Sequence, residues 1–143
     1  LDTARPFNSV FAIGAAQEAV DVAVKYANER ETFGKRIIDH QAVAFQLVDL
    51  QMKVDAARAM TYYALSAGGK GVKLGRMASE AKAFPTELCQ QVAIDAIQIL
   101  GGYGYMKDYP LEKICRDLRL FTICGGTNEI QREIISRTMK EKR

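Results

Sequence analysis

The chain has 143 residues, of which 48% are hydrophobic and 26% are charged, and its formal net charge is +3. This length allows one domain with a core and is too short for two ordinary domains, and the composition excludes a disordered chain. The small net charge argues against a nucleic-acid partner, and no apolar run in the sequence is long enough to span a bilayer.

Apolar residues at alternating spacings of three and four predict a first helix from about Pro6 to Arg30. A loop marked by Gly34 follows, and a second helix is expected from Gln41 to Ser66. A helix that is apolar on two sides is usually packed between neighbours, so we expect the second helix to contact other helices or another subunit. Its two stripes are Val43, Leu47, Leu50, Val54, Ala57 and Ala64 on one side, and Phe45, Val48, Met52 and Met60 on the other.

A third helix is predicted from Leu74 to Leu100, with a kink just before Pro85, because proline lacks a backbone donor and crowds the preceding turn. Residues 101–110 are rich in glycine and aromatic residues and are expected to form a loop. A short helix from Leu111 to Asp117 and a last helix from Asn128 to Lys140 follow, and no stretch alternates convincingly as a strand. The pattern predicts an all-α, up-and-down helical bundle of about four long helices and one short one.

Four segments carry a resemblance: ANERETFGKRIIDHQA (27–42), QILGGYGYMKDYPLEK (98–113), CRDLRL (115–120) and GGTNEIQREI (125–134). In this order and spacing they resemble the C-terminal domain of the acyl-CoA dehydrogenases, FAD-dependent enzymes that desaturate acyl-CoA thioesters. The resemblance covers nearly the whole chain and implies that residues 1–143 are this helical domain. It also implies that an N-terminal helical domain and a central β-domain complete the enzyme, so the isolated chain is expected to be inactive.

The resemblance assigns one group of residues to FAD, with Arg30 and Thr32 at the diphosphate and adenine end of a neighbouring subunit's cofactor. The fixed donors of a guanidinium match phosphate oxygens. Without the family, Arg30 is a helix-end cation that offsets the helix dipole, and the glycines of QILGG are a helix C-cap rather than a close approach to a ligand. The full group is Arg30, Thr32, Phe33, His40, Gln41, Gln98, Ile99, Leu100, Gly101 and Gly102.

A second group lies in FTICGGTNEIQ, residues 121–131, where two glycines and a threonine precede the last helix. By the resemblance, Thr127, Asn128 and Glu129 meet the flavin at a helix N-terminus that offers free N–H groups. A plain N-cap formed by Thr127 or Asn128 is the alternative, and the two interpretations are compatible. The resemblance assigns the acyl-CoA substrate to Asp2, Ala4, Arg5 and Gly126.

The catalytic base of the family is missing from its usual places. The family's reaction removes the α-proton of the thioester with a carboxylate, while the β-hydrogen leaves as hydride to the flavin. Most members carry a glutamate at the position of Gly125, and others carry one at the position of Ala4. The backbone N–H of Gly125 can still polarise the thioester oxygen. Glu129 and Asp2 are the nearest acids in sequence, and neither is expected to be the base.

This absence leaves three hypotheses. In the first, the protein is an acyl-CoA dehydrogenase whose base lies outside residues 1–143. In the second, it is a catalytically silent, FAD-binding subunit of a hetero-oligomer, and Gly125→Glu would raise activity by roughly 10²–10⁴-fold if the geometry survives. In the third, the chain is a non-enzymatic helical module that self-associates through its second helix.

The expected partners also come from the resemblance: an acyl-CoA substrate, an electron-transfer flavoprotein as electron acceptor, and a homo-oligomer built as a dimer of dimers. No nucleic acid, membrane or metal is expected. Three cysteines without paired spacing favour reduced thiols inside a cell, in a bacterial cytoplasm or a mitochondrial matrix. Because the sequence opens on LDTARP without an initiator methionine, we expect it to be a piece of a longer protein.

Overall fold

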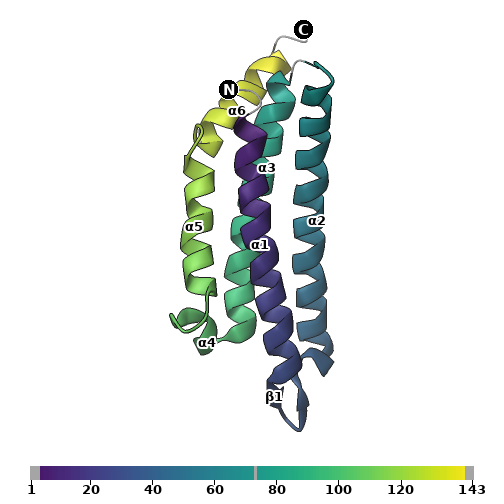
Figure 1. The fold of residues 1–143 in the computed structure, drawn as a ribbon, viewed down its shortest axis with the longest axis vertical. Coiled ribbons are helices and arrows are strands. Elements are labelled where there is room, and N and C mark those ends of the chain that lie inside the picture. The colour runs from purple at the N-terminus through teal and green to yellow at the C-terminus, as the bar shows by residue number, and fades with distance from the viewer. Residues whose placement is uncertain (1–3, 73, 141–143) are drawn as a thin grey trace.

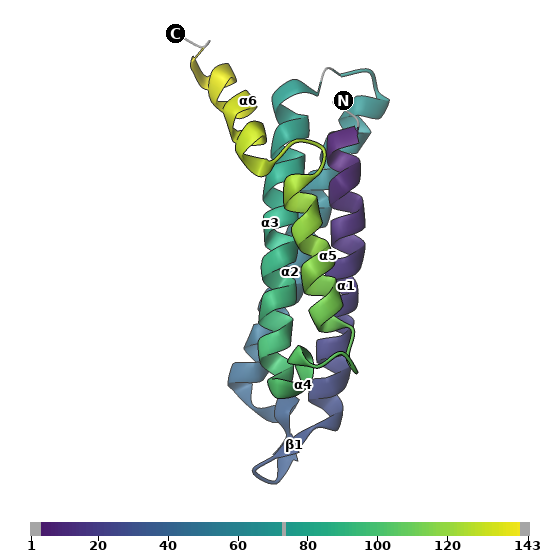
Figure 2. The ribbon, with the colours of Figure 1, turned by 90° about the vertical axis from the view of Figure 1, so that its left-hand side faces the viewer.

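The computed structural model describes residues 4–72 and 74–140, so Asp2, a predicted substrate contact, lies outside the described residues. Its helices are α1 (Ala4–Glu29), α2 (Gln41–Gly69), α3 (Gly75–Leu100), α4 (Gly102–Tyr105), α5 (Leu111–Ile123) and α6 (Asn128–Lys140). α1, α2, α3 and α5 run side by side along the long axis (Figure 1), and α6 leans away from one end (Figure 2). The predicted all-α, up-and-down bundle is confirmed. Among the described residues, no helix is both long and apolar enough to cross a membrane.

The helix α5 is longer than predicted. It continues to Ile123, past the expected end at Asp117. The reason is that its buried face, which starts at Leu111 and Ile114, continues through Leu118 and Thr122 at helical spacing. The connection from α5 to α6 is therefore short, and it consists of little more than the two glycines and the threonine singled out in the sequence.

The connection between α1 and α2 contains a small hairpin that the sequence pattern did not predict. The strands β1 (Glu31–Thr32) and β2 (Lys35–Arg36) pair antiparallel, and the 3-10 helix η1 (Ile37–Asp39) follows them. Phe33 and Gly34 have φ values of 53° and 79°, as the two central residues of a type I′ turn require. Strands of two residues leave no alternation in the sequence, so the pattern could not predict them.

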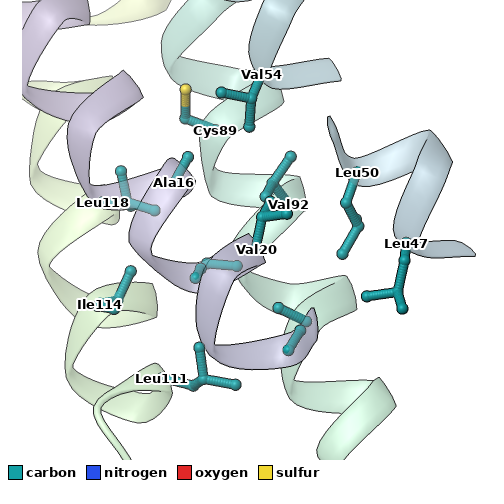
Figure 3. Close-up of a cluster of buried hydrophobic side chains, with 14 of the residues drawn as sticks. Ala16, Val20, Leu47, Leu50, Val54, Cys89, Val92, Leu111, Ile114 and Leu118 are labelled. Atoms are coloured by element: carbon teal, nitrogen blue, oxygen red, sulfur yellow. The ribbon is translucent and has the colours of Figure 1, made fainter. Parts of the chain in front are cut away.

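The core lies between α1, α2, α3 and α5 (Figure 3). Alanines along α1 leave little side chain between it and its neighbours, so that these helices pack closely; they are Ala12, Ala16, Ala19, Ala23 and Ala27, all fully buried. Of the two apolar stripes on α2, the first is buried through Leu47, Leu50 and Val54. The second faces outward, since Phe45 is 60% exposed and Met52 is 57% exposed. Its contact with another subunit stays a prediction.

The helix α3 continues through Pro85. Pro85 has no N–H to give to the carbonyl of Ala81, four residues earlier. The Ser9 hydroxyl of α1 donates to this carbonyl at 2.7 Å and so replaces the missing backbone bond. Both Ser9 and Pro85 are buried, which makes this bond a link between the two helices at the core. The kink stays a prediction.

Ser9→Ala is expected to lower the free energy of unfolding by about 1–2 kcal/mol, because the Ala81 carbonyl would remain buried without a donor. Urea denaturation followed by circular dichroism measures the change. Ser136→Ala is the matched control: its hydroxyl donates within α6 to the carbonyl of Glu133, and its loss is expected to cost less than about 0.5 kcal/mol. Equal losses in the two variants would contradict the role given to Ser9.

Candidate functional site

The predicted site residues separate into two groups at opposite ends of the bundle (Figure 1). The loop site, residues 124–129, joins α5 to α6 beside the start of α1. The hairpin site comprises residues 30–41 and residues 98–102 at the other end. Lys82, which contacts the loop site, and Gln98 of the hairpin site both lie on α3, 16 residues apart. At about 1.5 Å per residue their backbones are roughly 24 Å apart, so the two sites are separate surfaces of the bundle.

The loop site is held from its inner side by a buried lysine. Gly125 and Gly126 have φ values of 66° and 88°, which glycine adopts readily. The Lys82 ammonium of α3 donates to the Gly126 carbonyl at 2.9 Å and to Asn128 Oδ1 at 2.7 Å. The Gln131 carboxamide donates to the same Gly126 carbonyl at 3.0 Å. Donors from α3 and α6 therefore fix the two-glycine turn.

Asn128 extends this network into α3. Its Nδ2 donates to the Ala83 carbonyl at 3.2 Å and to Thr86 Oγ1 at 3.1 Å. Asn128 is only 2% exposed and Lys82 is fully buried. With its side chain turned into the protein, Asn128 can present only its backbone to a ligand at the loop. The flavin contact that the resemblance assigns to Asn128 stays a prediction.

The electrostatics of the loop site follow from burial and neighbouring anions. Burial lowers the pKa of the Lys82 ammonium, while Cys124, Glu129 and Glu87 oppose that shift. The pKa of Glu129 is lowered by its own backbone N–H and by the Thr127 hydroxyl, with smaller help from Arg132 and Arg119. A carboxylate that removes an α-proton needs a raised pKa. The pKa of Glu129 is lowered instead, which argues against Glu129 as the base.

Thr127 caps the helix α6. Its hydroxyl oxygen accepts from the Ile130 N–H at 3.4 Å, which confirms the N-cap interpretation of this turn. The cap does not exclude a ligand, because the backbone N–H groups of the first turn remain at the end of the helix. Thr127 and Glu129 line a small polar cavity of about 100 Å³ with Gln90 and Arg119.

The outer side of Gly125 is covered by Asn8 of α1. A Cβ atom added at Gly125 would overlap the Asn8 carboxamide nitrogen, so a side chain at position 125 requires the half-buried Asn8 side chain to turn aside. Ala4 is exposed at the start of α1. Nearby, the Arg5 guanidinium donates to Ser79 Oγ at 3.3 Å. Neither of the two positions at which the resemblance places the family's glutamate holds a carboxylate here.

At the hairpin site, Thr32 and His40 lie side by side. The His40 Nε2 atom is 3.5 Å from Thr32 Oγ1 and 3.4 Å from the Thr32 carbonyl oxygen. Phe33 packs edge-on against the His40 ring, yet Phe33 is 97% exposed at the tip of the turn. An aromatic side chain held out at a hairpin tip is available to a partner molecule. The structure thus brings together three of the residues predicted to contact FAD.

Arg30 lies at the mouth of an open groove of about 510 Å³, lined also by Tyr26, Leu100, Gly102, Tyr103 and Met106. Tyr26, Tyr103 and Tyr109 form an aromatic cluster with ring centroids 6.0–6.1 Å apart. Burial raises the pKa of the Tyr26 phenol. The groove therefore offers one guanidinium and flat aromatic faces, which suits an anionic ligand with a ring system.

The structure separates some predicted contacts from this groove. Gln98 lines a different cavity of about 210 Å³ beside Lys53 and Asp95 of the facing helices. Leu100 is 3% exposed and belongs to the core, so only its backbone can meet a ligand. Tyr103 contacts the rings of Tyr26 and Tyr109 although it is 48% exposed, and Tyr105 is 83% exposed. Gly101 has a φ of 60° and ends α3 as a C-cap.

Sequence reasoning missed the residues that hold the sites: Asn8, Lys82, Gln131 and Tyr26. Lys82 had a visible signal, because it interrupts a helix face that is otherwise small and apolar, with Ala78 and Cys89 on the same side. Asn8 and Gln131 carried no such signal. Their roles come from contacts with the loop that only the folded chain brings about.

Comparison with known proteins gives one family. Residues 1–140 match the family model described as "Acyl-CoA dehydrogenase, C-terminal domain". The chain is 43% identical over 142 residues to "Caffeyl-CoA reductase-Etf complex subunit CarC" of Acetobacterium woodii, covering 99% of this chain and 38% of that protein. The chain thus spans about a third of the length of the curated relatives that it matches.

Solved structures share the fold. Butyryl-CoA dehydrogenase from Megasphaera elsdenii superimposes with a TM-score of 0.94 and 33% identity, over 97% of this chain and 36% of that one. A structure of PigA with FAD and proline superimposes with a TM-score of 0.91 and 27% identity, over 98% of this chain and 37% of that one.

Proposed function

Because the chain belongs to the acyl-CoA dehydrogenase family, we propose that it is the C-terminal helical domain of an FAD-dependent enzyme that desaturates an acyl-CoA thioester. The observation that carries the proposal is the match of residues 1–140 to the family's C-terminal domain. The named relatives support the chemistry, since one is a butyryl-CoA dehydrogenase and another is a subunit of a caffeyl-CoA reductase complex. The rest of the enzyme, an N-terminal helical domain and a central β-domain, is part of the same proposal.

Two features of the fold support FAD as the cofactor. The first is the Arg30 groove, which a guanidinium lines together with two tyrosines, Tyr26 and Tyr103. The second is that the loop site and the hairpin site lie at opposite ends of the bundle. By the family resemblance the hairpin residues reach the FAD of a neighbouring subunit, so the proposed arrangement is a homo-oligomer in which each FAD meets the loop site of one subunit and the hairpin site of its neighbour. The structure of PigA with FAD and proline supports the same cofactor.

The chain's own residues then have defined tasks. Arg30 binds the cofactor diphosphate. The loop of Gly125 and Gly126 receives the thioester, and the Gly125 N–H donates to its carbonyl oxygen as negative charge develops there. Bound FAD supplies the hydride acceptor. The carboxylate that takes the α-proton comes from outside residues 4–140, since Glu129 has a lowered pKa and positions 4 and 125 carry no acid.

The electron acceptor is proposed to be an electron-transfer flavoprotein. The name of the Acetobacterium woodii relative places that protein in a complex with Etf, which supports this partner. The comparisons do not favour the two alternatives. A purely structural helical module leaves the exposed Phe33 and the Arg30 groove without a role, and a silent subunit has only the missing glutamates in its favour.

The proposal is tested with the full-length protein, purified alone and loaded with FAD. Mixing it anaerobically with a panel of acyl-CoA thioesters is expected to bleach the flavin absorbance with at least one of them, because hydride transfer reduces the flavin. A protein that binds FAD and is bleached by none of the thioesters would support the silent subunit instead. A protein that binds no flavin would contradict both.

A further inference from the structure

Lys82 is the most deeply buried cation in the described part of the chain, and it points at the loop site. Its relative exposure is 0%. Its ammonium reaches from α3 to two oxygens of the loop, the Gly126 carbonyl at 2.9 Å and Asn128 Oδ1 at 2.7 Å. Among the residues of α3 (Gly75–Leu100), Lys82 is the one that donates charge-assisted hydrogen bonds to this loop. The contact joins residues 44 and 46 positions apart in the sequence.

Packing alone does not explain an ammonium in this place. Moving a cation out of water costs free energy. Replacing a buried charged group by a hydrophobic side chain of similar volume often leaves the stability of the protein unchanged or raises it. Both hydrogen-bond acceptors of Lys82 are neutral oxygens, so no direct ion pair offsets the cost. The charge therefore calls for a role beyond filling the core.

The loop needs an anchor because its two glycines restrict the backbone little. Gly125 and Gly126 both adopt left-handed φ values, and a chain of two glycines samples many other conformations at similar energy. Lys82 of α3 and Gln131 of α6 both donate hydrogen bonds to the Gly126 carbonyl. A charge-assisted hydrogen bond is about twice as strong as a neutral one, so Lys82 contributes more than Gln131 to fixing the Gly126 carbonyl.

We propose that Lys82 is a positioning residue, whose buried charge fixes the Gly125–Gly126 backbone in the form that receives the carbonyl of an acyl thioester. The catalytic part of this inference rests on the proposed function. The fixed cation also lies under the loop at which negative charge develops on the thioester oxygen, where preorganised charge acts most strongly.

The test replaces Lys82 by methionine, which keeps the length and removes the charge, in the full-length protein. Lys113→Met is the matched control, because Lys113 is an exposed cation paired with Asp117 on α5. Hydrogen exchange of the amides of residues 125–129 is expected to accelerate at least tenfold in Lys82→Met and to stay unchanged in the control, while exchange in α1 stays slow in both. With an acyl-CoA that reduces the wild-type flavin, kcat is expected to fall at least tenfold while KM changes less than threefold.

A folded Lys82→Met protein with wild-type exchange at the loop would overturn the proposal, whatever its activity. If Lys82→Met does not fold, Lys82→Gln is measured in its place. Loss of folding in both variants would also overturn the proposal, because Lys82 would then serve the fold itself. If no acyl-CoA reduces the wild-type flavin, the proposed function fails, and the exchange measurement still decides the role of Lys82.

Discussion

Arg30→Ala is expected to weaken FAD binding by about 10- to 100-fold in the full-length protein and to leave the bundle folded. Arg30 follows the last residue of α1 and is exposed, and its side chain lines the groove beside Tyr26 and Tyr103. A hydrogen bond to a charged group contributes about 1.5–3 kcal/mol, which corresponds to this range of affinity. The core does not depend on the Arg30 side chain, so the thermal unfolding of the apoprotein should hardly change.

Titration of the apoprotein with FAD, followed by flavin fluorescence, measures the effect. Arg116→Ala is the matched control, because Arg116 is an exposed arginine that pairs only with Glu112 of its own helix. Its loss is expected to leave FAD binding within twofold of the wild type. If Arg30→Ala binds FAD as tightly as this control, Arg30 is a helix-end cation and not a diphosphate contact.

Much of the fold could be predicted from the sequence because the helices bury regular stripes. The start of α2 at Gln41 and the span of α6 agree with the pattern, since local periodicity determines them. The length of α5 was underestimated, because its buried face continues through Leu118 and Thr122 on a helix of otherwise polar composition. The two-residue strands at Glu31 and Lys35 are too short to show any period.

The candidate site was only half predictable. The residues of the motifs, such as Arg30 and Thr127, could be named from the resemblance. What holds them could not, because Lys82 and Asn8 act through contacts that depend on how α1, α3 and the loop pack. The resemblance already divides the FAD contacts into two groups and gives one of them to a neighbouring subunit's cofactor. The structure adds that these groups lie at opposite ends of the bundle, as a cofactor shared between subunits requires.

Gly125→Glu is expected to lower the free energy of unfolding by about 1.5–3 kcal/mol. The left-handed φ of 66° at position 125 costs a residue with a Cβ about 1–2 kcal/mol. Turning the half-buried Asn8 side chain aside adds about 0.5–1 kcal/mol, because the overlapping atom is the end of a flexible side chain. Asn8→Ala removes the second cost and not the first, so the double variant Asn8→Ala/Gly125→Glu is expected to recover only the smaller part of the lost stability. Urea denaturation of the two single variants and the double variant gives the coupling between the positions.

The same three variants separate the two catalytic hypotheses. If the base lies outside residues 4–140, a glutamate at position 125 adds nothing that the enzyme lacks, and the double variant is expected to turn over no faster than Asn8→Ala. In a silent subunit, the new carboxylate would supply the missing base and raise activity by roughly 10²–10⁴-fold. The double variant compared with Asn8→Ala is the cleaner test, because the new glutamate then has room whether or not the Asn8 side chain turns aside in the single variant.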